Sequence, residues 1–136
     1  MGFPPRKIII TTTHKASDES RSLSKLLEHV IPNATYIPRG SKNIDEILII
    51  SLEADAEYIF ICHSKGNKVT EIKFYQIVED QLKLLDRYMK IYEYIDYKIF
   101  GWPTMPEKGP LSVSREVRNV NPEIIDFMVK MFRLEV

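Results

Sequence analysis

The stretch Lys7–His14, KIIITTTH, decides the fold. It contains three consecutive isoleucines, and such an apolar run is typical of a strand that is buried on both faces. A strand of this kind lies inside a sheet covered by helices, where the carboxyl ends of the strands form the usual binding crevice. Three threonines, His14 and Lys15 follow the isoleucines. We therefore expect a ligand site at this end of the strand, unless the threonines simply complete the strand.

Composition limits the class of protein. The chain has 136 residues, 44% of them hydrophobic and 28% charged, which is typical of one soluble globular domain with a real core. No segment approaches the roughly 20 apolar residues of a membrane span, and the amino-terminal sequence MGFPPRK lacks the apolar core of a secretory signal. We expect a cytoplasmic protein without membrane contact. Cys62 is the single cysteine, which excludes an internal disulfide and argues against a thiolate zinc site.

The charges are unevenly distributed although the net charge is zero. Residues 1–44 contain seven Lys and Arg but only three Asp and Glu, which gives this portion a net charge of +4. Residues 45–57 contain five acidic residues and no Lys or Arg. The chain therefore has one basic portion followed by one acidic helix, and the acidic helix is a candidate surface for a protein partner.

The pattern of elements after the first strand predicts the fold class. A helix capped by Ser17 and ended at Pro32 is expected first, followed by a strand over residues 34–38. Next comes a helix capped by Asn43, whose inward face is Ile44, Ile47, Leu48, Ser51 and Leu52. A strand over 58–62, a hairpin turn over 63–67 and a strand over 68–78 complete this part. This β-α-β-α-β-β order predicts a mixed α/β fold in three layers, with a sheet between helices.

The pattern weakens after Glu79. Leu82, Leu85, Tyr88, Met89 and Tyr92 would suit one face of a helix, whereas residues 88–100 are rich in strand formers, and we favour strands. Residues 101–110 contain three prolines and predict a loop. A further strand over 111–115 and a terminal helix opened by Asn121 and Pro122 complete the prediction.

Known catalytic and cofactor motifs are missing from the sequence. Neither of the glycine-rich phosphate-binding patterns GxGxxG and GxxxxGK[ST] occurs, and HExxH and GxSxG are also missing. Cys62 and His63 are adjacent, but neighbouring residues on a strand point to opposite faces, so their side chains should not meet. We expect no cofactor, no metal and no catalytic residue, with Cys62 as a buried structural residue and His63 at the end of its strand.

The loop Arg39-Gly40-Ser41-Lys42 is the strongest candidate for binding an anion. It combines a bidentate donor, a glycine that permits close backbone approach, and the amino terminus of a helix, all of which suit phosphate. The alternative is an ordinary solvated turn. Lys65 and Lys68 flank the expected hairpin tip, where a solvated turn is the better interpretation.

Three segments together resemble the archaeal Brix-domain proteins. They are TTTHKASDESRSLSKLL, PNATYIPRGSKNIDEI and YIFICHSKGNKVTEIKFYQI, and the resemblance covers about residues 7–78. The related eukaryotic family acts in ribosomal RNA processing and ribosome assembly. Thr12, Thr13 and His14 stand where that family has a Thr-Ser-Arg type motif, so Lys15 or Arg21 would replace the arginine.

The resemblance implies a fold of two related halves, each similar to the anticodon-binding domain of class II aminoacyl-tRNA synthetases. Residues 1–136 would form one Brix-like domain, with 1–78 as the first half and 79–136 as an abbreviated second half. The implied activity is RNA binding without catalysis. The candidate RNA-binding residues are Thr12, Thr13, His14, Lys15, Arg21, Arg39, Gly40, Ser41 and Lys42.

Three functional hypotheses follow. The first is a non-catalytic ribosome-biogenesis factor that binds ribosomal RNA, or a pre-ribosomal particle, through its basic strand-end loops. The second is a small α/β enzyme that acts on a nucleotide or phosphorylated metabolite in the same crevice, and it would need an acid or base converging on residues 11–15. The third is a protein-protein adaptor that uses the acidic helix.

Overall fold

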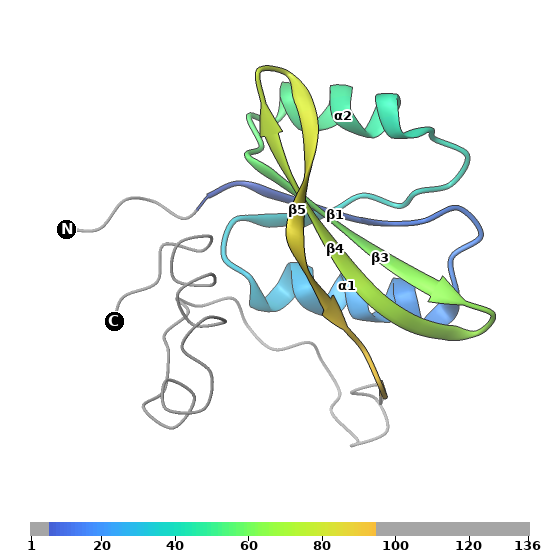
Figure 1. The fold of residues 1–136 in the computed structure, drawn as a ribbon. Coiled ribbons are helices and arrows are strands. Elements are labelled where there is room, and N and C mark those ends of the chain that lie inside the picture. Colours follow the sequence, from blue (N-terminus) through green and yellow to red (C-terminus); the bar gives the residue numbers. More distant parts are fainter. Residues whose placement is uncertain (1–5, 95–136) are drawn as a thin grey trace, which may run out of the picture.

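The computed structural model of the chain describes residues 6–94. Its elements are β1 (Ile8–Thr12), α1 (Asp18–Val30), β2 (Ala34–Tyr36), α2 (Ile44–Glu53), β3 (Tyr58–Lys65), β4 (Lys68–Val78) and β5 (Gln81–Lys90). The strands form one sheet in the order β2-β1-β3-β4-β5. β1 pairs in parallel with β2 and β3, whereas β4 pairs antiparallel with both β3 and β5. Figure 1 shows this sheet with α1 and α2 beside it.

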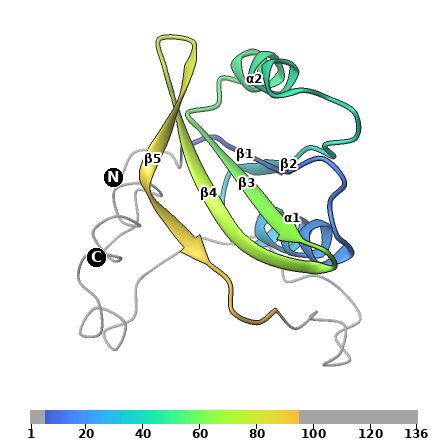
Figure 2. The same ribbon diagram turned by 45° about the vertical axis from the view of Figure 1, so that its right-hand side comes forward.

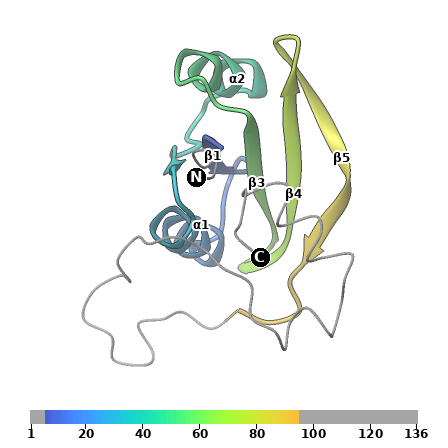
Figure 3. The ribbon, with the colours of Figure 1, turned by 90° about the vertical axis from the view of Figure 1, so that its left-hand side faces the viewer.

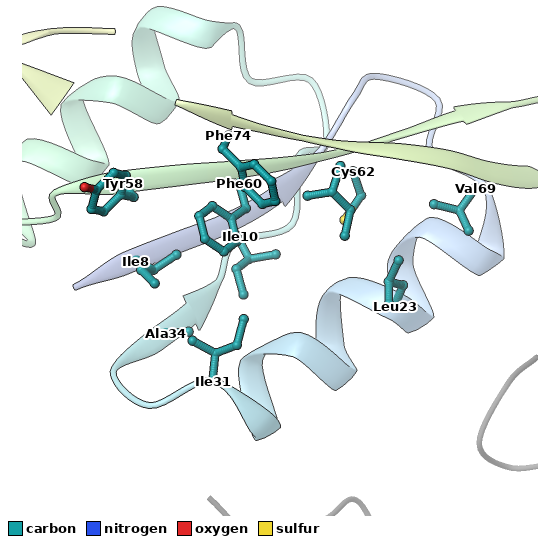
Figure 4. Packing of buried hydrophobic residues seen from close by; sticks show 11 residues of the cluster. Ile8, Ile10, Leu23, Ile31, Ala34, Tyr58, Phe60, Cys62, Val69 and Phe74 are labelled. Carbon is teal, nitrogen blue, oxygen red and sulfur yellow. The ribbon is translucent and has the colours of Figure 1, made fainter. Parts of the chain in front are cut away.

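The two helices lie on opposite sides of β1, as Figure 3 shows. Because side chains alternate along a strand, Ile8 and Ile10 pack on the α1 side, whereas Ile9 packs with Ile47 on the α2 side. In Figure 4 the side chains of Ile10 and Phe60 lie above α1 in the first of these two cores. The predicted mixed α/β fold with a sheet between helices is therefore confirmed.

Both predicted helix caps are present. The Ser17 hydroxyl accepts a hydrogen bond from the Ser20 amide at 3.1 Å, and the Asn43 side chain accepts one from the Glu46 amide at 2.9 Å. Each cap satisfies an amide that has no partner inside its helix. The inward face predicted for α2 is confirmed at Ile47 and Ser51, which are fully buried, whereas Ile44 is 36% exposed.

The first strand extends beyond the three isoleucines. Thr11 and Thr12 belong to β1 and are as buried as the isoleucines before them. The Thr11 hydroxyl donates to the carbonyl of Ile37 at 2.7 Å, so it binds the chain after β2. These two threonines complete the strand, and the ligand site at this strand end stays a prediction.

The hairpin turn predicted over residues 63–67 is wrong in extent. β3 continues to Lys65, where Lys65 pairs with Lys68, and a β-bulge lies between His63 and Ser64. The turn consists of Gly66 and Asn67 alone. Gly66 has a φ of +60°, a backbone conformation that glycine adopts at little cost. Two residues suffice because such tight turns follow the twist of the paired strands.

The helix considered for residues 82–92 does not form. Gln81–Lys90 is a strand that pairs with β4, and it begins earlier in the chain than the strand favoured over 88–100. Glu79 and Asp80 connect β4 to β5, both with positive φ, as a tight hairpin requires. The loop over 101–110, the strand over 111–115 and the terminal helix lie outside the described residues. The division into halves at residue 78 remains a prediction.

Candidate functional site

Three segments meet at one edge of the sheet because β1, β2 and β3 are parallel. They are residues 13–17 after β1, residues 37–43 after β2, and the end of β3. We call the first two segments the strand-end loops. They lie on the right in Figure 1, near the hairpin that joins β3 to β4. Eight of the nine candidate RNA-binding residues belong to these loops or end β1, and Arg21 lies in the first turns of α1.

Arg39 binds the two strand-end loops to each other. Its Nη1 donates to the carbonyl of Thr12 at 2.8 Å, and its Nε donates to the carbonyl of Lys42 at 2.7 Å. The planar guanidinium can serve both acceptors at once, which an amine cannot do with the same geometry. Arg39 therefore fixes the end of β1 against the turn that leads into α2.

His14 makes a second connection between the loops. Its Nε2 lies 2.6 Å from the carbonyl oxygen of Lys42. Because a carbonyl only accepts, the proton must be on Nε2. Lys42 also closes its own turn, since its amide donates to the carbonyl of Arg39 at 3.0 Å. Gly40 within this turn has a φ of +51°.

The remaining candidate residues differ in their exposure. Lys15, Gly40 and Ser41 are exposed, and Thr13 is half-buried with its amide bonded to the carbonyl of Cys62 at 3.2 Å. Thr12 is 1% exposed and its hydroxyl donates to the carbonyl of Thr13, so its side chain does not reach the surface.

The two other cations bond to neighbouring groups of the chain and stay partly exposed. The side chain of Arg21 is 47% exposed, donates to the Ala16 carbonyl at 2.8 Å and pairs with the Asp18 carboxylate. The Nζ of Lys42 donates to the carbonyl of Pro38 at 3.3 Å. The edge therefore presents three lysine and arginine head groups, those of Lys15, Arg21 and Lys42, on a backbone that Arg39 and His14 hold in place.

The acids of α1 that lie near this edge are engaged in structural contacts. Asp18 pairs with Arg21. The carboxylate of Glu19 accepts from the Val69 amide at 3.0 Å and lies 3.7 Å from the Nζ of Lys68. Both acids also sit in the first turn of α1, where the helix dipole favours negative charge.

His63 also lies at this edge, near the end of β3, and it is not among the nine residues predicted for the site. Its Nε2 is buried and has no hydrogen-bond partner among the described residues. Burial lowers the pKa of His63, and the positive charges of Lys73 and Arg39 lower it further, against the opposing effect of Glu71. The position of His63 at the end of a buried run was visible in the sequence, but its neighbours on β4 and in the loop were not.

Cys62 and His63 point to opposite faces of the sheet, as expected. Cys62 is fully buried in the core on the α1 side. His63 lies opposite Glu71 on the other face. Burial raises the pKa of the Cys62 thiol to about 11, partly offset by a hydrogen bond with Ser24. Such a thiol is a poor nucleophile at neutral pH.

Residues 6–94 contain neither a cluster of metal-binding side chains nor a membrane-spanning helix. No group of three or more His, Cys, Asp or Glu lies close enough to hold a metal ion there. In the same part of the chain, neither helix has the length and apolar character needed to cross a membrane.

Proteins of known family resemble parts of this chain, although no protein-family model matches it. A probable Brix domain-containing ribosomal biogenesis protein from Methanopyrus kandleri is 40% identical over 63 residues, which are 46% of this chain and 33% of that protein. A protein of the same description from Pyrococcus horikoshii is 41% identical over 69 residues, covering 48% of this chain and 31% of the relative. The match thus spans about a third of the length of these relatives.

A solved structure shares the fold. The crystal structure of a probable ribosomal biogenesis protein from Aeropyrum pernix K1 matches with a TM-score of 0.77 and 19% sequence identity. The match covers 96% of this chain and 74% of that one. In sequence over about half its length, this chain is similar to archaeal Brix domain-containing ribosomal biogenesis proteins, and in fold it is similar to a probable ribosomal biogenesis protein.

Proposed function

We propose that this protein is a non-catalytic RNA-binding factor of ribosome biogenesis that acts in the cytoplasm on ribosomal RNA or a pre-ribosomal particle. One observation carries the proposal: Arg39 and His14 hold the two strand-end loops together while lysine and arginine head groups remain at the surface. The relatives described as ribosomal biogenesis proteins support the same process.

The residues of the edge would have two roles in RNA binding, which are contact with the RNA and positioning of the loops. Lys15 and Lys42 would neutralise phosphates, as would Arg21 on exchanging its Asp18 partner for a phosphate, and the exposed backbone at Gly40 and Ser41 would allow close approach. Arg39 and His14 would position the loops, because their donor groups are already bonded to backbone carbonyls. A preorganised loop loses less conformational freedom when RNA binds, which favours affinity.

The engaged acids support the absence of catalysis in this proposal. An enzyme working on a phosphorylated substrate at this edge would need a free acid or base near β1. Asp18 and Glu19, the acids that follow β1, are instead paired with Arg21 and with the start of β4. An RNA-binding site needs only donors and cations.

Salt dependence of binding tests the proposal. A ribosomal RNA fragment is titrated with the full chain at several salt concentrations and followed by fluorescence. Neutralising three phosphates releases condensed counterions. A plot of the logarithm of the binding constant against the logarithm of the salt concentration should therefore have a slope of about −2 to −3. Lys15→Ala should lower the affinity and reduce the slope by about 0.7 to 0.9.

Two exposed charges far from this edge serve as controls. Lys83 lies near the start of β5, at the opposite end of the sheet, and Glu53 ends α2. Lys83→Ala and Glu53→Ala should bind like the wild type. Binding that does not depend on salt, or a Lys15→Ala titration identical to that of the wild type, would remove the strand-end loops from the RNA site.

The outer face of α2 favours a second candidate function, that of a protein-protein adaptor. Ile49 is 56% exposed and Ile44 is 36% exposed, among the acids Asp45, Glu46 and Glu53. Exposed isoleucines rimmed by acids suit a basic protein partner. Ile49→Ser should weaken capture of such a partner without changing RNA binding, whereas a loss of RNA binding would contradict this assignment.

A further inference from the structure

Two exposed tyrosines with a lysine between them lie at the end of β5 and just after it. Tyr88 is 58% exposed and Tyr92 is 87% exposed, and Lys90 between them is also exposed. The Nζ of Lys90 lies 5.3 Å from the centre of the Tyr92 ring. Each exposed tyrosine ring offers a flat apolar face with a polar hydroxyl at its end.

Strand register places this lysine and Tyr88 on the face of the sheet that α2 covers elsewhere. Tyr88 lies opposite Lys73 of β4, and Lys73 lies opposite Ile61 of β3. Ile61 packs with Ile47 of α2, and residues directly opposite each other on paired strands share a face. Lys90, two residues after Tyr88, lies opposite Glu71. The Glu71 carboxylate is 3.8 Å from the Nζ of Lys73.

This group of residues continues from the strand-end loops. β5 runs parallel to β3, since each pairs antiparallel with β4, so Tyr88 and Lys90 lie toward the edge at which β1 and β3 end. β5 is also one of the two edge strands of the sheet formed by residues 6–94, as Figure 2 shows. Between the loops and β5 lies His63 of β3, which is opposite Glu71 of β4, and Glu71 is in turn opposite Lys90 of β5. His63, Glu71 and Lys90 thus form a row across β3, β4 and β5, in which the Glu71 carboxylate lies between cationic groups.

We propose that Tyr88, Lys90 and Tyr92, together with Lys73, form a stacking strip for single-stranded RNA that extends from the strand-end loops. The inference rests on the proposed function and narrows its ligand. Tyrosine rings stack on the open faces of unpaired bases, and Lys90 between them and Lys73 opposite Tyr88 attract the phosphates. A duplex hides its base faces inside the helix, so the strip selects unpaired RNA.

The test compares two RNA probes on the full chain. They are a fluorescent single-stranded oligouridine of roughly 10 nucleotides and a duplex RNA of the same length. Tyr88→Ala with Tyr92→Ala should weaken binding of the oligouridine by roughly tenfold or more and leave duplex binding unchanged. The salt slope should not change, because no positive charge is removed. Tyr88→Phe with Tyr92→Phe should bind like the wild type, since phenylalanine also stacks.

A leucine pair distinguishes stacking from a general apolar contact. Tyr88→Leu with Tyr92→Leu should bind the oligouridine as weakly as the alanine pair, and full affinity would overturn the strip. An equal loss on both probes, or no loss with the alanine pair, would also overturn it. If any of these results overturned the strip, a reduced salt slope in Lys15→Ala would still support the proposed function. A wild type that binds neither probe would defeat both proposals.

Discussion

Arg39 and His14 donate to the same atom, the carbonyl oxygen of Lys42, at 2.7 and 2.6 Å. A carbonyl has two lone pairs and can accept from both. One donor comes from the loop after β2 and the other from the loop after β1, so a single backbone oxygen joins the two loops. The conformation of the strand-end loops thus depends on hydrogen bonds to backbone carbonyl oxygens.

Replacing Arg39 should destabilise the fold. Arg39→Ala removes a charged donor from two backbone carbonyls and should lower the free energy of unfolding by about 1–3 kcal/mol. Arg39→Lys keeps the charge but cannot reproduce the planar geometry, so it should restore little of this loss. Urea denaturation of the three proteins measures the effect. Full recovery by lysine would mean that charge, and not the bridging geometry, matters at this position.

Ile9→Asp should prevent folding. Ile9 is 1% exposed in the α2-side core, and an unpaired carboxylate there costs several kcal/mol, compared with a total domain stability of about 5–15 kcal/mol. Circular dichroism with thermal melting provides the measurement. The matched control is Ile49→Asp, because Ile49 is 56% exposed on α2 and should tolerate the change. A cooperatively folded Ile9→Asp protein would contradict the central position of β1.

The stability should decrease as the pH falls through the region where a free histidine titrates. Burial lowers the pKa of His63 in the folded state below its ordinary value of 6.5. The unfolded chain then binds more protons than the folded one, so the free energy of unfolding drops as pH falls below about 6.5. Denaturation midpoints at pH 7.5 and 5.5 avoid most of the carboxylate titration.

A His63→Gln variant isolates this contribution. Its denaturation midpoint should change less than that of the wild type between the two pH values. A pH dependence that is the same in His63→Gln and wild type would show that His63 does not cause it.

Cys62 should resist alkylation in the folded protein. Its thiol has a pKa of about 11 and no exposed surface, so little thiolate is accessible at pH 8. Iodoacetamide labelling followed by mass spectrometry should show modification only after denaturant unfolds the chain. Labelling of the native protein at the rate of a free thiol would contradict the buried position. Cys62→Ala should still fold.

The features that were predicted correctly from sequence depend on local patterns. The caps at Ser17 and Asn43 and the buried isoleucine run are determined by neighbouring residues, and these patterns gave β1, α1 and α2. The extent of β3 and the start of β5 depend on pairing with β4, which no short segment specifies. The sequence therefore predicted the layers of the fold but not the ends of its hairpins.

In the candidate site, too, local features were predictable from the sequence and contacts between distant segments were not. The sequence predicted which loops form the edge, because parallel strands end together. It did not predict that Arg39 binds backbone carbonyls, since every residue offers a carbonyl and the sequence does not show which one is near. His63 was missed for a related reason, because its environment is made by Lys73 and Arg39 from other segments.

The mixed pairing of the sheet has a consequence for the order of folding. β3, β4 and β5 are joined by tight turns, so they can pair while the chain between them closes only short loops. β1 lies between β2 and β3. Ile8 of β1 pairs with Tyr58 of β3, so forming this pair must close a long loop of chain. Because nonlocal contacts form slowly, we expect the β3–β5 meander to form early and β1 to insert late. The isoleucines that hold the core together would then be among the last to leave water.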